Sequence, residues 1–539
     1  MQTASSFLKR YGPIIGFGII IWLVFNQAVY FGFLLWDDNI HITDNPYLQG
    51  PLWQWPKILW IFQLNTSMRF EPVTWLAHLL ICSLFTINAG VYHFCLIVLH
   101  FINSILVYKL CCRVLGKFKD NGLPTETIAF VATAFWAIDA VRAESLGRCT
   151  DISYPLATLF VLGSFGFYLG SFDKSALRPG PYTWSFILNG IAVCTYPIAL
   201  GFGFCLPFFD RIFFPLETEH RWNIRATGFF TYWSSRFFFI LPSVAVGWVT
   251  VRARLHPSGG YAPFIYKSTP FNPFRLVHAI YAWAYIYLHQ FWPFDLTPAQ
   301  YPWPDLGFHR VYLFAFFCLA AVLALAWRQR SPAILAGLAA SLCLLGPMLG
   351  LSEAPITPVD RYTYLPNAFF TLLLAWGVAR WWLRSACPAA TAARITLGLG
   401  FILLPLMGLQ SRRQLQIWQS TYTLLSYIEA TTPGIKSDSG FQDFLTNKRA
   451  AQLILDGKPD AALPIYKDLV RHQPGNCYYW HHLGLSLYLL GHYEESLRAL
   501  QIAYTLCHDP ITGQLIQHIQ SLYPPKKDAP AASIAVHGQ

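Results

Sequence analysis

Apolar stretches long enough to cross a lipid bilayer recur along this chain, and they restrict its possible folds more than any other feature. The first covers residues 13–34, and others cover residues 91–115, 152–171 and 395–409. A membrane-crossing helix needs about 17–25 mostly apolar residues, a length that the first three of these stretches reach. Only 12% of the residues are charged, whereas about 25% are charged in soluble domains. The chain is therefore predicted to be an all-α, polytopic transmembrane helical bundle.

Short basic loops predict how these helices cross the membrane. Lys9 and Arg10 precede the first stretch, and Lys109 and Arg113 lie at the end of the second. Because basic loops stay on the cytoplasmic side, the N-terminus is predicted to be cytoplasmic. The same loops account for the net charge of +11, so no nucleic-acid partner is expected.

About eleven crossings are predicted, an odd number that places the C-terminus on the outer face. Beyond the four stretches above, crossings are expected at residues 125–139, 182–215 (an outward and return pair), 237–251, 311–327, 332–351 and 365–383. Residues 37–90 are predicted to form a long outer loop, in which residues 72–87 make a helix that lies in the membrane interface. Residues 276–291 are predicted to be interfacial or re-entrant.

The sequence changes character after this transmembrane domain, which is predicted to cover residues 1–410. A linker is expected at residues 411–440, followed by about two tetratricopeptide repeats at residues 441–523 and a disordered tail at residues 524–539. The second repeat shows the expected spacing most clearly, at Trp480, Gly484, Tyr488, Tyr493, Ala503 and Pro510. Such repeats bind peptides or act as a docking cap.

The cysteines show no zinc-like spacing, and no metal site is predicted. Cys477 and Cys507 flank a helical hairpin that is expected outside the cytoplasm, where a disulfide between them is feasible.

Charged groups gather at the predicted outer ends of the membrane helices. They are Asp37, Asp38, Asp139, Glu144, Asp151, Asp360 and Arg361. A carboxylate at the membrane surface can deprotonate a hydroxyl, and an arginine can hold a phosphate. This set suits the transfer of a sugar from a lipid phosphate. A solvated acidic pair at Asp37-Asp38 and a local ion pair at Asp360-Arg361 are the structural alternatives. The phosphate-loop, HExxH and GxSxG motifs are absent.

In their order along the chain, these motifs resemble the transmembrane and tetratricopeptide-repeat-containing O-mannosyltransferases, most closely a prokaryotic member, within the GT-C class. The matching pieces include Asp37-Asp38 with Asp44-Asn45-Pro46, Pro72-Val73-Thr74-Trp75-Leu76, Tyr92-His93, Arg142-Ala143-Glu144-Ser145, Thr150-Asp151, Trp292-Pro293 with Tyr301, and Asp360-Arg361-Tyr362. The sequence departs from the family pattern at Glu71, Asp139-Ala140 and Tyr196-Pro197.

The resemblance implies a role for each matching position. Asp37 or Asp38 would be the catalytic base, and Glu144 the acidic residue of the second outer loop. The donor's phosphate and lipid would contact Arg361, Asp360, Tyr362 and Tyr301. Arg142, Asp151 and His93 would orient the acceptor or support the site.

The resulting prediction is an inverting glycosyltransferase that moves a mannose-like sugar from a polyprenyl-phosphate donor to a hydroxyl, expected on protein Ser or Thr. The repeats would present this protein acceptor. The expected location is a bacterial inner membrane with a periplasmic site, or alternatively the endoplasmic reticulum. A non-enzymatic scaffold that recruits partners through its repeats, and a lipid or solute transporter, are the competing functions. Charges near the bilayer midplane, which a transporter needs, are scarce.

Overall fold

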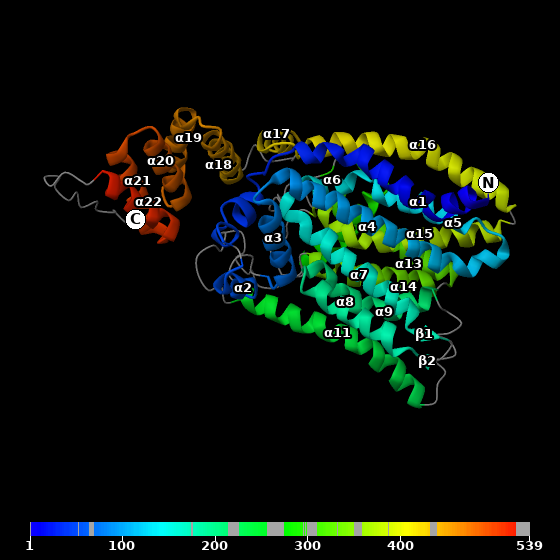
Figure 1. The fold of residues 1–539 in the computed structure, drawn as a ribbon. Coiled ribbons are helices and arrows are strands. Elements are labelled where there is room, and N and C mark those ends of the chain that lie inside the picture. The colour runs from blue at the N-terminus through cyan, green and yellow to red at the C-terminus, as the bar shows by residue number, and fades with distance from the viewer. Residues whose placement is uncertain are drawn as a thin grey trace. The chain divides into compact units, whose positions relative to one another are not determined.

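The computed structural model describes residues 2–51, 53–63, 69–173, 176–213, 226–255, 274–294, 296, 298, 310–330, 332–349, 358–385, 388–431 and 439–523. Helices dominate these residues, as predicted. The chain divides into two compact units, Met1–Thr432 and Pro433–Gln539. Within the first unit, α1, α4, α5, α15 and α16 run side by side (Figure 1).

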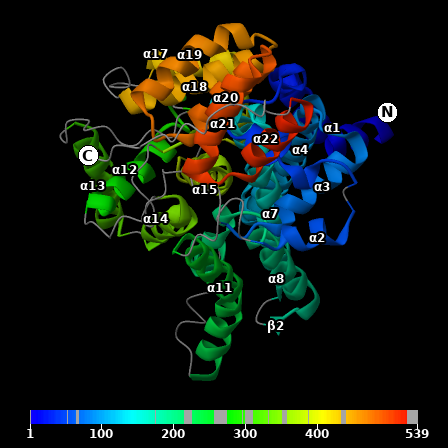
Figure 2. The ribbon, with the colours of Figure 1, turned by 90° about the vertical axis from the view of Figure 1, so that its left-hand side faces the viewer.

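The first unit is built mainly from long helices. These are α1 (Gln2–Phe25), α4 (Ala89–Leu115), α5 (Thr125–Ala137), α7 (Ser153–Gly170), α8 (Pro179–Val193), α9 (Phe202–Phe213), α11 (Ala226–Leu255), α12 (Phe274–Leu288), α13 (Arg310–Gln329), α14 (Pro332–Leu345), α15 (Tyr364–Arg384), α16 (Ala389–Gln416) and α17 (Thr421–Thr431). Helix α11 packs beside α8, with the carbonyl of Ser235 accepting from Tyr182 near the start of α8, and its N-terminal part projects from the unit (Figure 2).

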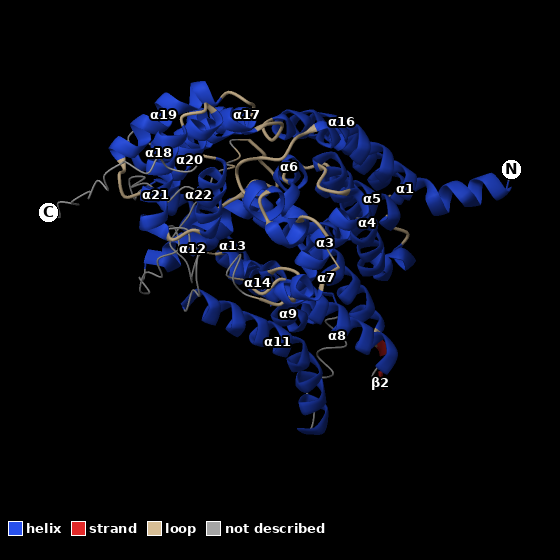
Figure 3. Ribbon diagram, turned by 60° about the vertical axis from the view of Figure 1, so that its left-hand side comes forward, coloured by secondary structure: helices blue, strands red, loops and turns tan. Residues whose placement is uncertain are grey.

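Short elements join these helices. They are η1 (Asn26–Tyr30), η2 (Asn39–Thr43), η3 (Pro46–Leu48), α2 (Trp55–Ile61), α3 (Pro72–Phe85), η4 (Gly116–Asn121), η5 (Ala140–Arg142), α6 (Ala143–Gly147), η6 (Cys149–Ile152), η7 (Pro197–Gly201), η9 (Gly346–Met348) and η10 (Asp360–Thr363). Among the described residues, strand structure is limited to the antiparallel pair β1 (Phe172–Asp173) and β2 (Ala176–Leu177). Figure 3 colours strand residues red and helices blue.

Five helical segments in the described part of the chain are long and apolar enough to cross a membrane. They are Tyr11–Tyr30, Ala89–Leu115, Cys149–Gly170, Ser234–Arg252 and Ala389–Gln416. Their length and composition fit an integral membrane protein built as a helical bundle. Shorter apolar helices cover Pro72–Phe85, Leu313–Gln329 and Pro332–Met348. The larger number of about eleven crossings stays a prediction.

Hydrogen bonds at both ends of α4 show how its neighbours are arranged. Near its start, His93 Nδ1 lies 3.0 Å from the carbonyl oxygen of Leu146. Near its end, Arg113 donates to the carbonyl of Gly166, late in α7, at 3.0 Å. A rise of 1.5 Å per residue separates His93 from Arg113 by about 30 Å, which matches the hydrocarbon core of a bilayer. The segment around Leu146 and the end of α7 therefore lie a membrane thickness apart.

The second unit contains five helices in the described residues: α18 (Ser439–Leu455), α19 (Pro459–His472), α20 (Cys477–Leu489), α21 (Tyr493–Cys507) and α22 (Pro510–Leu522). Neighbouring helices pack in sequence order around a core that includes Tyr466 and Leu483. The tail at residues 524–539 lies outside the described residues. The range predicted as a linker, 411–440, includes the end of α16 and all of α17, and the boundary between the units falls after Thr432.

Two turns of this unit repeat the same structure. Gly457 and Gly491 both have positive φ, at 73° and 83°, a conformation that glycine adopts without a steric penalty. The residue after each glycine donates to a carbonyl five residues earlier: Lys458 to Leu453 and His492 to Leu487, both at 2.9 Å. These backbone hydrogen bonds cap the ends of α18 and α20. The two glycines are 34 positions apart, so the helical hairpin repeats with that period.

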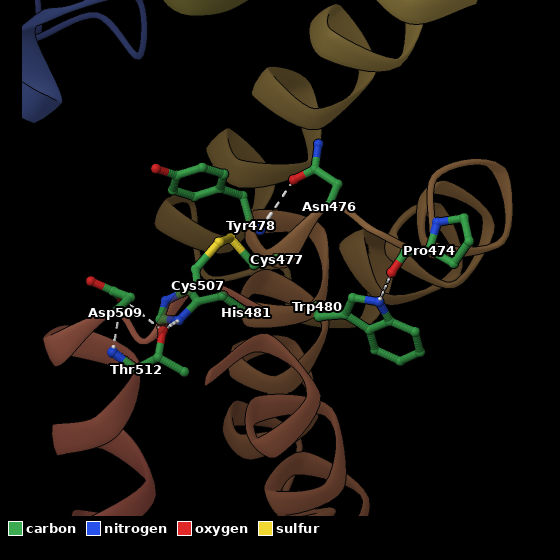
Figure 4. Close-up of a disulfide and its surroundings, with 9 residues drawn as sticks. All are labelled: Pro474, Asn476, Cys477, Tyr478, Trp480, His481, Cys507, Asp509 and Thr512. Atoms are coloured by element: carbon green, nitrogen blue, oxygen red, sulfur yellow. Dashed lines mark hydrogen bonds between the residues drawn. A yellow bond between two sulfur atoms is a disulfide. The ribbon is translucent and has the colours of Figure 1, made fainter. Parts of the chain in front are cut away.

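The disulfide between Cys477 and Cys507 is confirmed. It joins the first residue of α20 to the last residue of α21, with the two Cα atoms 6.0 Å apart (Figure 4). Beside it, Asp509 accepts hydrogen bonds from the backbone N–H and the hydroxyl of Thr512, at 3.0 and 2.7 Å. The disulfide therefore closes the open end of the helical hairpin.

Candidate functional site

Charged residues from three distant segments meet at one end of the first unit, where α6 lies (Figure 1). Asp37 follows η1, Glu144 lies in α6, Arg148 and Asp151 lie just before and in η6, and Arg361 lies in η10. We call these five residues the acid–arginine cluster. Their elements are the connections at the ends of α1, α5, α7 and α15, which explains why residues far apart in sequence converge.

Arg148 is the centre of this cluster. Its guanidinium forms an ion pair with Asp37, and its Nη1 lies 3.4 Å from Glu144 Oε1 and 3.7 Å from Asp151 Oδ1. The side chain is almost fully buried. A buried guanidinium requires such compensation, because removing a charge from water is costly.

Glu144 connects Arg148 to Arg361. One carboxylate oxygen of Glu144 pairs with the guanidinium of Arg361, and the other accepts the backbone N–H of Arg361 at 2.8 Å. Both side chains are buried. Because Glu144 contacts both guanidinium groups, it is suited to holding the two arginines in place.

The adjacent residues Asp37 and Asp38 have different environments. Asp38 is fully buried, and its two oxygens accept the backbone N–H groups of Leu34 and Thr150 at 3.0 and 2.9 Å. Asp37 remains 39% exposed while it pairs with Arg148. Asp38 therefore holds two chain segments together, and Asp37 is the carboxylate that an incoming molecule can reach.

A second group lies close by and is buried throughout. Arg142 donates to the hydroxyl of Thr363 at 2.6 Å, and its guanidinium lies over the rings of Trp136 and Tyr364, at 5.7 and 5.4 Å from their centroids. Burial lowers the pKa of Arg142 to about 10, although nearby acids and Tyr364 oppose this change.

The acids beside Arg142 keep atoms without a hydrogen-bond partner in the described part of the protein. Asp139 caps η5 through one oxygen, which accepts the N–H of Val141 at 3.2 Å, and its second oxygen has no such partner. Asp360 Oδ1 also has no hydrogen-bond partner among the described residues. Burial and the neighbouring Glu144 carboxylate raise the pKa of Asp360. This group is therefore polar and buried.

The remaining predicted site residues are placed as follows. His93 is buried, and its Nε2 lies 3.5 Å from the sulfur of Cys149. Tyr362 is nearly buried beside Arg361, whose guanidinium lies 5.4 Å from the ring centroid. Tyr301 lies outside the described residues. The cluster thus brings together Asp37, Glu144, Asp151 and Arg361 of the predicted set.

Two residues of the cluster region are missing from the predicted set. Arg148 is its centre, and the four-residue separation from Glu144 in the sequence is a signal that was available. Trp418, in the turn after α16, lies with its ring centroid 5.8 Å from the Arg148 guanidinium. Nothing in the local sequence links Trp418 to this site, because the contact depends on the return of α16 to the same end of the unit.

Gly147 makes the contact with Trp418 possible. A Cβ atom at position 147 would lie 2.6 Å from the Cβ of Trp418, closer than non-bonded carbons approach. Glycine is therefore required between Leu146 and Arg148 for Trp418 to cover the arginine.

No group of three or more His, Cys, Asp or Glu side chains suited to a metal ion occurs in the described ranges. No family model, no curated protein and no solved structure matches the chain.

Proposed function

We propose that this chain is a membrane glycosyltransferase that moves a sugar from a polyprenyl-phosphate donor to a hydroxyl acceptor. The observation that carries the proposal is the acid–arginine cluster, in which one accessible carboxylate, Asp37, lies beside buried arginines at an end of the helical bundle. By the resemblance described above, the donor sugar is mannose-like and the acceptor is protein Ser or Thr.

The roles follow from accessibility and charge. Asp37 accepts the proton of the acceptor hydroxyl as its oxygen attacks the anomeric carbon. The bond from that carbon to the phosphate oxygen breaks, and the polyprenyl phosphate leaves with the electron pair. Arg361 and Arg148 supply positive charge where the leaving phosphate gains negative charge. Glu144 holds both guanidinium groups, and attack from the face opposite the phosphate inverts the configuration.

The location of the cluster supports a lipid-linked donor. The cluster lies at one end of helices that are long enough to cross a bilayer, so a lipid phosphate in the headgroup layer is within reach of it. Basic residues such as Arg113 lie about a membrane thickness away along α4, which is the arrangement expected when the cluster faces away from the cytoplasm. The periplasmic face of a bacterial inner membrane fits this orientation.

The C-terminal unit supports an acceptor-presenting role. Its helical hairpins repeat with a 34-residue period, which is the period of tetratricopeptide repeats. Its disulfide favours an oxidising compartment, on the same side of the membrane as the proposed reaction. If the chain is instead a non-enzymatic scaffold, deletion of residues after 432 would abolish its activity in cells, and Asp37→Asn would have no effect.

The proposal is tested with the full chain in proteoliposomes that contain radiolabelled polyprenyl-phosphate mannose and a Ser/Thr-rich protein acceptor. Asp37→Asn is expected to lower transfer by about 100-fold or more, and Arg361→Ala by a similar factor. Matched controls are Asp460→Asn and Arg394→Ala, which change exposed residues and should leave transfer unchanged. Undiminished transfer in both Asp37→Asn and Arg361→Ala would disprove the mechanism.

A further inference from the structure

Helix α2 directs an apolar face away from the rest of its unit. Trp55, Leu59 and Phe62 are spaced at i, i+4 and i+7, so they share one side of the helical path. They are 69%, 48% and 59% exposed. Trp60 and Ile61 lie on the opposite side and are buried. A short helix with apolar residues on both sides is uncommon on a surface that faces only water.

The inward side of α2 is firmly packed. The ring of Trp60 stacks on Tyr47, with 4.4 Å between centroids, and meets Trp75 of α3 edge-on at 4.7 Å. The ammonium group of Lys57 donates to the carbonyl of Gln49. The exposed face is therefore a defined surface of the fold, because its helix is held on the other side.

Helix α3 packs against α2 and has an exposed apolar stripe of its own. Leu76, Leu80 and Leu84 are spaced at i, i+4 and i+8 and are exposed. The opposite side of α3 is attached to the start of α4, where His78 and Cys82 lie 3.0 and 3.3 Å from the hydroxyl of Tyr92.

Helix α4, a candidate membrane-crossing segment, follows α3 in the chain. Phe94, Val98 and Ile102 form an exposed stripe at i, i+4 and i+8, and α4 is one of the five candidate spans. Helix α3 thus packs against both α2 and α4, and the exposed apolar stripe of α4 is expected to face lipid.

We propose that α2, together with Trp53, is a membrane-interface anchor whose partner is the phospholipid bilayer. The Trp55, Leu59 and Phe62 side chains insert among the headgroups and upper acyl chains, at the end of the unit that carries the acid–arginine cluster. Trp53 is also largely exposed, and tryptophan prefers this layer because its ring is apolar and its N–H is polar. The anchor holds the region before α4 against the bilayer surface.

The test uses photo-crosslinking in proteoliposomes of phosphatidylcholine and phosphatidylglycerol that contain tritiated phosphatidylcholine. Benzoylphenylalanine is placed by amber suppression at Leu59 or Phe62 in the full chain. Phe401 of the candidate span α16 is the positive control, and Tyr504 of the C-terminal unit is the exposed control. Lipid adducts at positions 59 and 62 are expected to reach within about threefold of those at 401 and to exceed those at 504 by about fivefold or more.

A pair of neighbouring substitutions gives a second readout in a folded chain. Trp55→Glu is expected to reduce the lipid adduct at position 62 by about fivefold, because a carboxylate resists entry into the interface. Gln54→Glu introduces the same charge one residue away, outside the apolar face, and should leave the adduct unchanged. Adducts to a second copy of the chain instead of lipid, lipid labelling at position 59 no higher than at 504, or equal effects of the two substitutions would each overturn the proposal.

Discussion

Arg361 is bound to Glu144 through both its backbone N–H and its guanidinium, although 217 positions separate the two residues. The first contact fixes the main chain of η10, and the second fixes the side chain. Because Glu144 also lies 3.4 Å from Arg148, one carboxylate joins two buried cations that would otherwise repel each other. The first prediction follows from this arrangement.

Glu144→Ala is expected to destabilise the first unit by about 3 kcal/mol, because it leaves two buried arginines with less compensating charge. The measurement is the temperature at which the detergent-solubilised chain loses its monodisperse peak in size-exclusion chromatography. Glu126→Ala removes an exposed carboxylate in the first turn of α5 and should change that temperature little. If Glu144 and Arg361 act as a pair, Glu144→Ala with Arg361→Ala will cost less than the sum of the single changes.

Gly147→Ala is expected to destabilise the chain by about 1–3 kcal/mol, because the added methyl group collides with Trp418. The same heating assay measures the loss. The matched control is Gly190→Ala in α8, where no atom lies within 4 Å of the position that the added methyl group would take. Removing the Cβ of residue 418 by Trp418→Gly should abolish the collision, so an added cost of Gly147→Ala in the Trp418→Gly background would contradict the explanation.

Replacing Cys477 and Cys507 together by serine is expected to destabilise the C-terminal unit by about 3–4 kcal/mol, since the disulfide closes a loop of 30 residues. Pulse proteolysis of the full chain, with mass spectrometry of fragments from residues 439–523, measures the change. The double Cys111→Ser, Cys112→Ser variant alters two thiols in α4 and should leave this region's protease resistance unaltered. Alkylation of both Cys477 and Cys507 in the native, unreduced protein would show that the bond does not form in the cell.

The stability of the C-terminal unit is expected to fall as the pH falls below about 6.5. Burial, with smaller contributions from His481 and Lys448, lowers the pKa of His482 from its ordinary value of 6.5 to about 3. At a pH between these two pKa values, His482 is protonated in the unfolded chain and neutral in the folded chain. Each pH unit in this window therefore lowers the free energy of unfolding by up to roughly 1.4 kcal/mol.

Pulse proteolysis of residues 439–523 at pH 7.5, 6.5 and 5.5 measures this dependence. His482→Gln should make the profile less steep between pH 6.5 and 5.5, because burial also lowers the pKa of His481 and its contribution remains, whereas the exposed His492→Gln should leave the profile as in the parent chain. A profile that is flat in the parent chain, or equally steep in both variants, would contradict the assignment to His482.

Much of the architecture could be predicted from local sequence patterns. The helix at residues 91–115 follows from an apolar run of membrane length and ends with basic residues, and the structure has α4 over Ala89–Leu115. The hairpin of α20 and α21 follows from periodic apolar residues, and its disulfide from two cysteines placed at its ends. These features depend on interactions between residues close in the chain or on helical periodicity, both of which a sequence displays directly.

Which of two adjacent acids is accessible was settled only by the tertiary structure. Nothing in the sequence distinguishes Asp37 from Asp38. In the structure, Asp38 is buried and accepts a hydrogen bond from the backbone N–H of Thr150, 112 positions away, whereas Asp37 stays at the surface. Trp418 reaches Arg148 for a similar reason, because α16 returns to the same end of the unit. The sequence alone determined a helical membrane protein with charges at its helix ends. Their pairing depends on contacts between distant segments, and a carboxylate's burial is a property of those contacts and not of its neighbours in the chain.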